Sequence, residues 1–180
     1  MNDLQKITPS LWFDQDTEEA INFYVAVFNG SPHKRRDSRI ISITRYEKGM
    51  EAPGADQMEG KVITAIFELN GQRFMALDGG PIFKFNEAVS FYVECEDQDE
   101  VDYFWKRLSA VPEAEQCGWL KDKFGLSWQI IPKQMGDLLG SPIRKKALAA
   151  APDLHRLSSS ALDRSARRAD AAPARRPDHR

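Results

Sequence analysis

Cysteine and histidine are scarce in this sequence, and long apolar runs are missing. The 180 residues include two cysteines and three histidines. Cys95 and Cys117 are too few for a disulfide scaffold and lack the paired spacing of a zinc ribbon, so we expect reduced thiols. No apolar run approaches the ~18 residues of a membrane helix, and the N-terminus carries no export or import signal. The sequence predicts a soluble, cytoplasmic protein without a membrane partner.

The composition, 42% hydrophobic and 29% charged, is typical of a globular chain long enough for one domain. The net charge of −2 conceals an asymmetry. Residues 141–180 contain ten Arg and Lys against four Asp, a net charge of +6, so residues 1–140 carry 15 basic and 23 acidic side chains, or −8. An acidic folded part argues against nucleic acid as a partner.

Residues 141–180 form a basic Ala/Arg-rich tail after a domain that we assign to residues 1–140. No aromatic residue follows Trp128, and the tail has no sustained apolar face. Burial therefore cannot offset the entropy of ordering it, and we expect disorder beyond a short helix near residues 143–151. A basic tether to nucleic acid or anionic lipid is the alternative, which the interleaved aspartates disfavour.

Two stretches of the domain are alike at an offset of 81 residues: 11–24 and 92–105. Each runs from a strand into a helix. Asp16 and Asp97 are followed three residues later by Glu19 and Glu100, the spacing of a capping box. Apolar residues at helical spacing follow both, so each helix is expected to bury one face. The repeat predicts a duplicated module.

Segments rich in β-branched and apolar residues complete each module. The first module has three after its helix, at 39–46, 62–69 and 72–77, with the hairpin dipeptide Asn70-Gly71 between the last two. The second has one strand before its helix and two clear strands after it: 88–95, 117–121 and 126–131. A further strand is poorly marked, and we place it near residues 110–115.

This order predicts an α+β fold of two βαβββ modules, with halves at about residues 4–82 and 83–135. Each module has a helix on one face of a short sheet. The opposite faces are expected to curl toward each other as a mixed sheet with a cleft.

Four separated motifs agree in order and spacing with a known family: residues 8–14, 74–81, 85–98 and 116–132. They resemble the PhnB-like family, often labelled 3-demethylubiquinone-9 3-methyltransferase, of the glyoxalase/bleomycin-resistance/dioxygenase (vicinal oxygen chelate) superfamily. The resemblance spans about residues 4–140 and implies the paired βαβββ architecture. It also implies a homodimer in which a partner chain completes or covers the cleft.

Relatives continue with an amphipathic helix where this chain departs from the pattern, after about Ser141. The Arg/Ala/Pro/Asp bias of the tail is what an out-of-frame reading of GC-rich DNA gives. We therefore also hypothesise that the tail is not native.

Catalytic members of the superfamily bind a divalent metal through His and Glu on inner strands. Their last ligand follows the pattern Asp-Pro-x-Gly-x-x-x-Glu, and the same spacing here runs from Asp122 to Gln129, a neutral amide. The histidine position of the fifth strand falls at Ser90. The three histidines lie in a loop and in the tail: His33, His155 and His179. We therefore predict no metal site.

The methyltransferase label would require a cofactor site, usually a Gly-rich turn between a strand and a helix. Asp78-Gly-Gly-Pro81 is followed by no helical pattern and is interpreted as a turn. We predict no cofactor.

The cleft is expected to be lined by aromatic and small polar side chains. Strand alternation and the motifs give these ligand-binding candidates: Trp12, Phe13, Met75, Ser90, Tyr92, Trp119 and Gln129. For the aromatic residues the competing interpretation is ordinary core packing. Glu94 is a weak candidate for a catalytic acid or base, against a solvated residue at the end of a strand.

Three functions stay open. The favoured one is a metal-free protein that binds an unknown small molecule in the cleft, because this needs only shape and polar anchors such as Gln129 and Ser90. The second is an enzyme of unknown reaction with Glu94 or Asp78 as base. The third is a dimeric interaction module, and the fold alone cannot choose among them.

Overall fold

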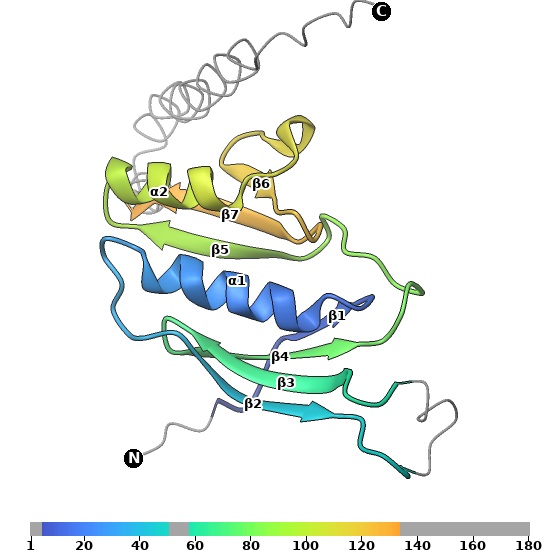
Figure 1. The fold of residues 1–180 in the computed structure, drawn as a ribbon. Helices are drawn as coiled ribbons and strands as arrows, with labels where there is room; N and C mark the ends of the chain where they lie inside the picture. The colour runs from blue at the N-terminus through green and yellow to red at the C-terminus, as the bar shows by residue number, and fades with distance from the viewer. Residues whose placement is uncertain (1–4, 51–57, 134–180) are drawn as a thin grey trace, which may run out of the picture. The chain divides into compact units, whose positions relative to one another are not determined.

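The computed structural model describes residues 5–50 and 58–133 (Figure 1). They divide into two units, one running to Ser90 and including Lys123–Ser127, the other containing Phe91–Asp122 and the residues from Trp128 onward. The basic tail and its predicted helix lie outside the described residues. Among the helices that are described, none is both long and apolar enough to cross a membrane.

The first unit contains a mixed four-stranded sheet and one helix (Figure 1). Its strands lie in the order β1-β4-β3-β2, with β1 parallel to β4 and the other pairs antiparallel. The elements are β1 (Ser10–Phe13), α1 (Thr17–Asn29), β2 (Arg39–Arg45), β3 (Val62–Leu69) and β4 (Gln72–Asp78). The predicted β-α-β-β-β order is confirmed.

The hairpin between β3 and β4 turns at Asn70 and Gly71, which have φ values of 49° and 89°. Two successive residues with positive φ are what a two-residue turn of the primed type requires, and Asn-Gly adopts it at little cost. Because this turn fixes the register, Phe67 lies directly opposite Phe74. Their rings stack with centroids 5.3 Å apart.

Helix α1 lies against one face of this sheet (Figure 1). The helix buries Ala20, Ile21, Tyr24, Val27 and Phe28, together with Thr17. The sheet supplies buried side chains at alternate positions of its strands: Leu11, Phe13, Ala65, Phe67, Phe74 and Ala76. Burying one such Phe or Leu side chain stabilises the fold by roughly 1.5–3 kcal/mol.

The cap of α1 comes from the sheet. Asp16 makes no side-chain capping hydrogen bond, and the backbone N–H of Thr17 donates instead to Oδ1 of Asp78 at 2.9 Å. The predicted capping box at Asp16 and Glu19 is therefore wrong. Parallel pairing places Asp78 beside Phe13, where β1 ends, so its carboxylate reaches the start of the helix.

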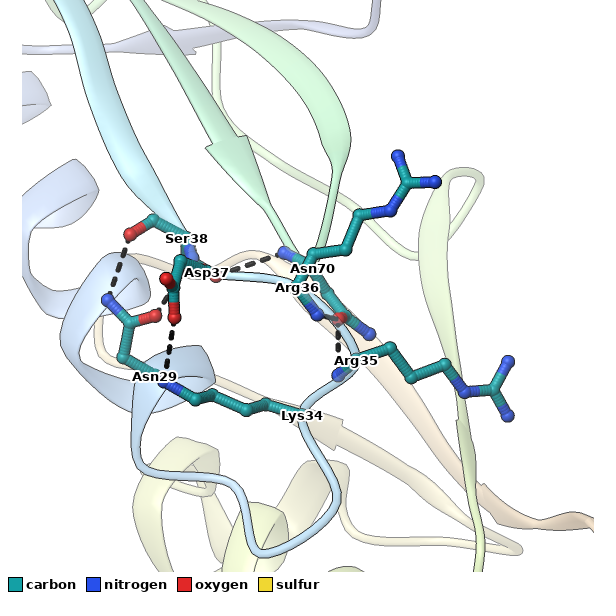
Figure 2. Close-up of polar contacts among 7 residues, drawn as sticks. All are labelled: Asn29, Lys34, Arg35, Arg36, Asp37, Ser38 and Asn70. Carbon is teal, nitrogen blue, oxygen red and sulfur yellow. Dashed lines mark hydrogen bonds and ion pairs between the residues drawn. The ribbon is translucent and has the colours of Figure 1, made fainter.

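The loop between α1 and β2 is fixed by side-chain amides (Figure 2). Asn29 exchanges two hydrogen bonds with the backbone of Ser38, at 2.8 and 2.9 Å. Oδ1 of Asn70 accepts from the backbone N–H groups of Arg35 and Arg36, both at 2.9 Å. The hairpin turn thus holds the backbone of this loop, while the side chains of Arg35 and Arg36 extend away from the network.

The segment Lys123–Ser127 also belongs to the first unit. The Phe124 ring packs edge-on against Phe13, Phe23 and Tyr24, with centroids 6.0, 5.9 and 5.8 Å away. The Lys123 ammonium lies over the Phe23 and Phe124 rings, 5.0 and 4.8 Å from their centroids, and is paired with Glu19. Phe124 therefore extends the core of this unit beside α1.

The second unit contains a three-stranded sheet in the order β5-β7-β6 and one helix. Its elements are β5 (Ser90–Cys95), α2 (Gln98–Leu108), β6 (Trp119–Lys121) and β7 (Ser127–Pro132). The capping prediction holds here. The Asp97 carboxylate accepts a hydrogen bond from the backbone N–H of Glu100 at 3.0 Å, and the Glu100 carboxylate accepts one from the backbone N–H of Glu96 at 2.8 Å.

The strand predicted near residues 110–115 is wrong. This segment contains a short 3₁₀ helix, η2 (Pro112–Ala114). Pro112 has a fixed φ and no backbone N–H, which suits the first position of a helix and removes a hydrogen bond that an inner strand would need. The described part of the second unit therefore has the order β-α-β-β.

Candidate functional site

The face of the first sheet opposite α1 brings together two of the predicted site residues. Strand β1 pairs Ser10 with Met75 and Trp12 with Leu77, and directly paired residues point to the same side of a sheet. The neighbouring positions, Leu11 and Phe13, are buried on the α1 side. Trp12 and Met75 are half-buried on the other side, which we call the open face.

The Trp12 ring is held in place at one end of the open face. Its Nε1 donates to the backbone carbonyl of Gly80 at 2.9 Å. The ring covers Gly79 so closely that a Cβ atom there would lie 2.2 Å from a ring carbon. Phe83 packs edge-on against Trp12 with centroids 4.9 Å apart, although Phe83 is 61% exposed. The Trp12 ring is therefore fixed in its orientation before any ligand arrives.

Phe13 does not share this surface. It is buried and packs against Phe85 at 5.2 Å as well as against Phe124. The structure thus places Phe13 in the core on the α1 side of the sheet, away from the open face.

Sequence reasoning missed several residues of the open face: Thr64, Ile66 and Leu77 in its middle, and Arg39, Glu68 and Arg73 at its far end. They follow from the β3–β4 register, which pairs Thr64 with Leu77, Ile66 with Met75 and Glu68 with Arg73. The Asn-Gly turn carried this information, because counting outward from a two-residue hairpin turn gives the same pairs.

Charges gather at the end of the open face that is remote from Trp12. Glu68, whose side chain is 16% exposed, is 3.1 Å from Arg39 Nη2 and 3.7 Å from Arg73 Nη2. Two guanidinium groups thus share one carboxylate, which leaves this end with a net positive charge.

In the second unit, β5 presents Tyr92 and Glu94 to solvent and Cys95 to the interior. Phe91 and Trp128 are in ring contact at 5.5 Å. Because strand residues alternate between faces, Gln129 of β7 belongs to the same face as Tyr92 and Glu94. Gln129 is half-buried, as are Ser90 at the start of β5 and Trp119 in β6.

Partial burial, followed by the nearby Glu94 charge and the Cys95 thiol, raises the pKa of Tyr92. Its phenol therefore stays protonated at neutral pH and can donate a hydrogen bond.

Comparisons with known proteins decide the family. The family described as 3-demethylubiquinone-9 3-methyltransferase matches residues 5–131. A solved structure of the PhnB protein from Bacillus cereus, described as a candidate 3-demethylubiquinone-9 3-methyltransferase, is 39% identical. The match covers 71% of this chain and 99% of that one, with a TM-score of 0.56. This chain belongs to the PhnB-like family.

A second solved structure, protein PA1353 from Pseudomonas aeruginosa, supports the fold alone. It is 18% identical to this PhnB-like chain, with a TM-score of 0.53 and coverage of 71% of this chain and 96% of that one. No curated protein matches the sequence.

The absence of a metal site in this PhnB-like chain stays a prediction that rests on the chemistry of its residues. Within residues 5–50 and 58–133, no group of three or more His, Cys, Asp or Glu side chains is placed to hold a metal ion. Gln129 stands where the superfamily pattern given above has its last metal ligand, a glutamate. Asp122 is buried and accepts a hydrogen bond from Nε1 of Trp128 at 2.8 Å, and His33 is exposed in a loop.

The Asp78-Gly-Gly turn has a structural role in this PhnB-like protein. Asp78 caps α1, as described above. Gly79 receives the Trp12 ring, and Gly80, with a φ of 81°, accepts the Trp12 hydrogen bond. The Asp78 carboxylate is thus already engaged by the first turn of a helix.

The two cysteines lie near opposite edges of the second sheet. Both are free. Cys95 is buried in β5, Cys117 is exposed before β6, and β7 lies between these two strands. Burial, reinforced by the charges of Glu100, Asp97 and Glu94, raises the pKa of the Cys95 thiol.

The raised pKa of Cys95 predicts a loss of stability at alkaline pH. The unfolded thiol ionises above about pH 8.5 while the folded thiol stays protonated, so this contribution is fully present at neutral pH. Above pH 8.5 it falls by about 1.4 kcal/mol per pH unit. We expect Cys95→Ala to flatten the decline in urea-denaturation free energy between about pH 8.5 and 10.

Cys117→Ala is the matched control, because its thiol is exposed in the folded protein. It should keep the decline of the parent protein. Equal pH slopes for the parent and Cys95→Ala would contradict the assignment.

Proposed function

We propose that this PhnB-like protein binds a small molecule on the open face of its first sheet without a metal ion. One observation carries the proposal: a fixed Trp12 ring and half-buried apolar side chains, Ile66, Met75 and Leu77, line a sheet face that α1 leaves uncovered. Apolar walls with a few polar groups are the usual composition of small-molecule sites.

Gln129, Tyr92, Ser90 and Trp119 stay ligand-binding proposals in the second module. Gln129 and Tyr92 offer amide and phenol groups rather than metal ligands. We also propose that the working form is a homodimer, as the family resemblance implies, and that it works in the cytoplasm. Light scattering on the purified full chain tests the stoichiometry.

An enzyme that uses Glu94 as base is less well supported. Glu94 is exposed to solvent on β5, whereas catalytic acids and bases usually lie in a pocket. The interaction module with no small ligand is the outcome that remains if no compound binds.

A thermal-shift screen of the full chain in EDTA tests the proposal. We expect at least one aromatic or amphipathic metabolite to raise the midpoint by several degrees, because a ligand of the native state stabilises it by mass action. Met75→Glu should abolish the shift, since it places a charge in the middle of the open face. Met50→Glu, in an exposed loop, should preserve it.

Two results would contradict the proposal. One is stabilisation by Zn²⁺ or Ni²⁺ in a parallel screen without EDTA, removed by Gln129→Ala, which would restore a metal site. The other is the absence of any response to the whole compound panel, which would favour the interaction module.

A further inference from the structure

The open face changes in chemistry along β4. Gly79, just past the strand, lies under Trp12; Leu77 and Met75 come next; Arg73 is at the other end. These are alternate residues, so they point to one side of the sheet. At about 3.3 Å per residue, the distance from Arg73 to Gly79 is roughly 20 Å along the strand. An aromatic end, an apolar middle and a charged end thus follow in line.

The aromatic end is preorganised. The Trp12 ring is pinned by its hydrogen bond to Gly80 and by its contact with Gly79, and Phe83 meets it edge-on while staying largely exposed. A ligand ring can contact both aromatic side chains without ordering either of them, which lowers the entropic cost of binding.

The charged end favours an anion. Arg39 and Arg73 both face Glu68, so two positive charges are opposed by one negative charge. Their side chains are 68% and 44% exposed. A guanidinium pair with unsaturated charge is suited to a carboxylate or similar planar anion, which it can bind through paired N–H donors.

From this arrangement we infer that the ligand class is an amphipathic anion, with an aromatic ring that packs on Trp12 and Phe83 and an acidic group that reaches Arg39 and Arg73. This inference rests on the proposed function and specifies its ligand. The apolar middle, with Ile66, Met75 and Leu77, takes the connecting chain of the molecule.

A set of four probes tests the inference on the full chain in EDTA by calorimetric titration. The probes are ω-phenyloctanoate, its uncharged amide, the corresponding amine, and octanoate, which lacks the ring. We expect the acid to bind tightest. The amide and octanoate should each bind at least about tenfold more weakly, because the amide lacks the negative charge and octanoate lacks the aromatic ring. The amine should bind weakest, because it places a cation beside two guanidinium groups.

Two variants test which end of the open face binds which part of the ligand. Arg73→Gln should lower the preference for acid over amide by about tenfold, and Phe83→Ala should lower the preference for ω-phenyloctanoate over octanoate. Matched controls are Arg107→Gln, at the end of α2, and Ile82→Ala, an exposed apolar neighbour of Phe83. Both controls should retain the parent affinities.

The outcomes separate the inference from the function that underlies it. If acid, amide and amine bind equally, or if Arg73→Gln keeps the full acid preference, the inference is overturned while small-molecule binding stands. If none of the four probes binds but the metabolite screen finds another ligand, the ligand class is again wrong. If neither finds a ligand, the proposed function fails with it.

Discussion

Trp128→Phe is expected to destabilise the protein by about 3 kcal/mol, measured as the free energy of unfolding in urea. Trp128 and Asp122 are both 1% exposed, and the indole Nε1 donates to Oδ2 of the carboxylate at 2.8 Å. Removing the indole N–H leaves a buried carboxylate oxygen without this donor. Hydrogen bonds to carboxylates contribute roughly 1.5–3 kcal/mol, and the smaller ring adds a packing loss.

Trp105→Phe is the control for this prediction. Nε1 of Trp105 is also buried but has no hydrogen-bond partner, so its loss leaves nothing unsatisfied. We expect a cost of about 1 kcal/mol or less. Equal costs for the two Trp→Phe variants would show that ring volume, and not the bond to Asp122, determines the effect.

Phe124→Ala is expected to cost a similar amount, about 3 kcal/mol. Its ring contacts three aromatic side chains, Phe13, Phe23 and Tyr24, at centroid distances near 6 Å. Each such pair contributes about 0.5–1.5 kcal/mol beyond the area buried. The variant also removes a ring that lies under the Lys123 ammonium. Urea denaturation of the full chain measures the loss.

Phe83→Ala serves as the comparison for Phe124→Ala. Phe83 has one ring contact, to Trp12, and is 61% exposed, so we expect a cost of about 1 kcal/mol or less. A Phe124→Ala variant as stable as Phe83→Ala would mean that residues Lys123–Ser127 do not pack beside α1 in solution.

Features encoded by short-range patterns were predictable from the sequence. The two helices, their buried faces and the β3–β4 hairpin depend on residues within a few positions of one another. Asp97 capped α2 as its spacing predicted. The strand expected at residues 110–115 was wrong. It was inferred from the repeat of the first module, but Pro112 favours the start of a 3₁₀ helix there.

The cap of α1 could not be read from local spacing. Asp16 and Glu19 have the same pattern as Asp97 and Glu100, yet only the second pair is used. The first helix takes its cap from Asp78, a residue 61 positions away. Parallel pairing of β1 with β4 decides this contact, and no local motif reports it.

The candidate site was partly predictable. Trp12 and Met75 were among the candidates and lie on the open face. The sequence could not tell which of Trp12 and Phe13 lies on that face, because strand alternation assigns faces only after the face of one residue is known. The charged end was missed because Arg39, Glu68 and Arg73 look like ordinary solvated strand residues in isolation. Only the register brings the three together.

The long-range bond between Thr17 and Asp78 has a consequence for the order of folding. Helix α1 leaves the ribosome well before β4, so its first turn frays until the later strand docks against β1. The first turn of α1 gains its cap only when Asp78, 61 residues later in the chain, reaches Thr17. Closing this loop has an entropic cost that the same β1–β4 pairing already requires. Strand pairing and helix completion are therefore energetically coupled, so a change that weakens the pairing of β1 with β4 also weakens the first turn of α1.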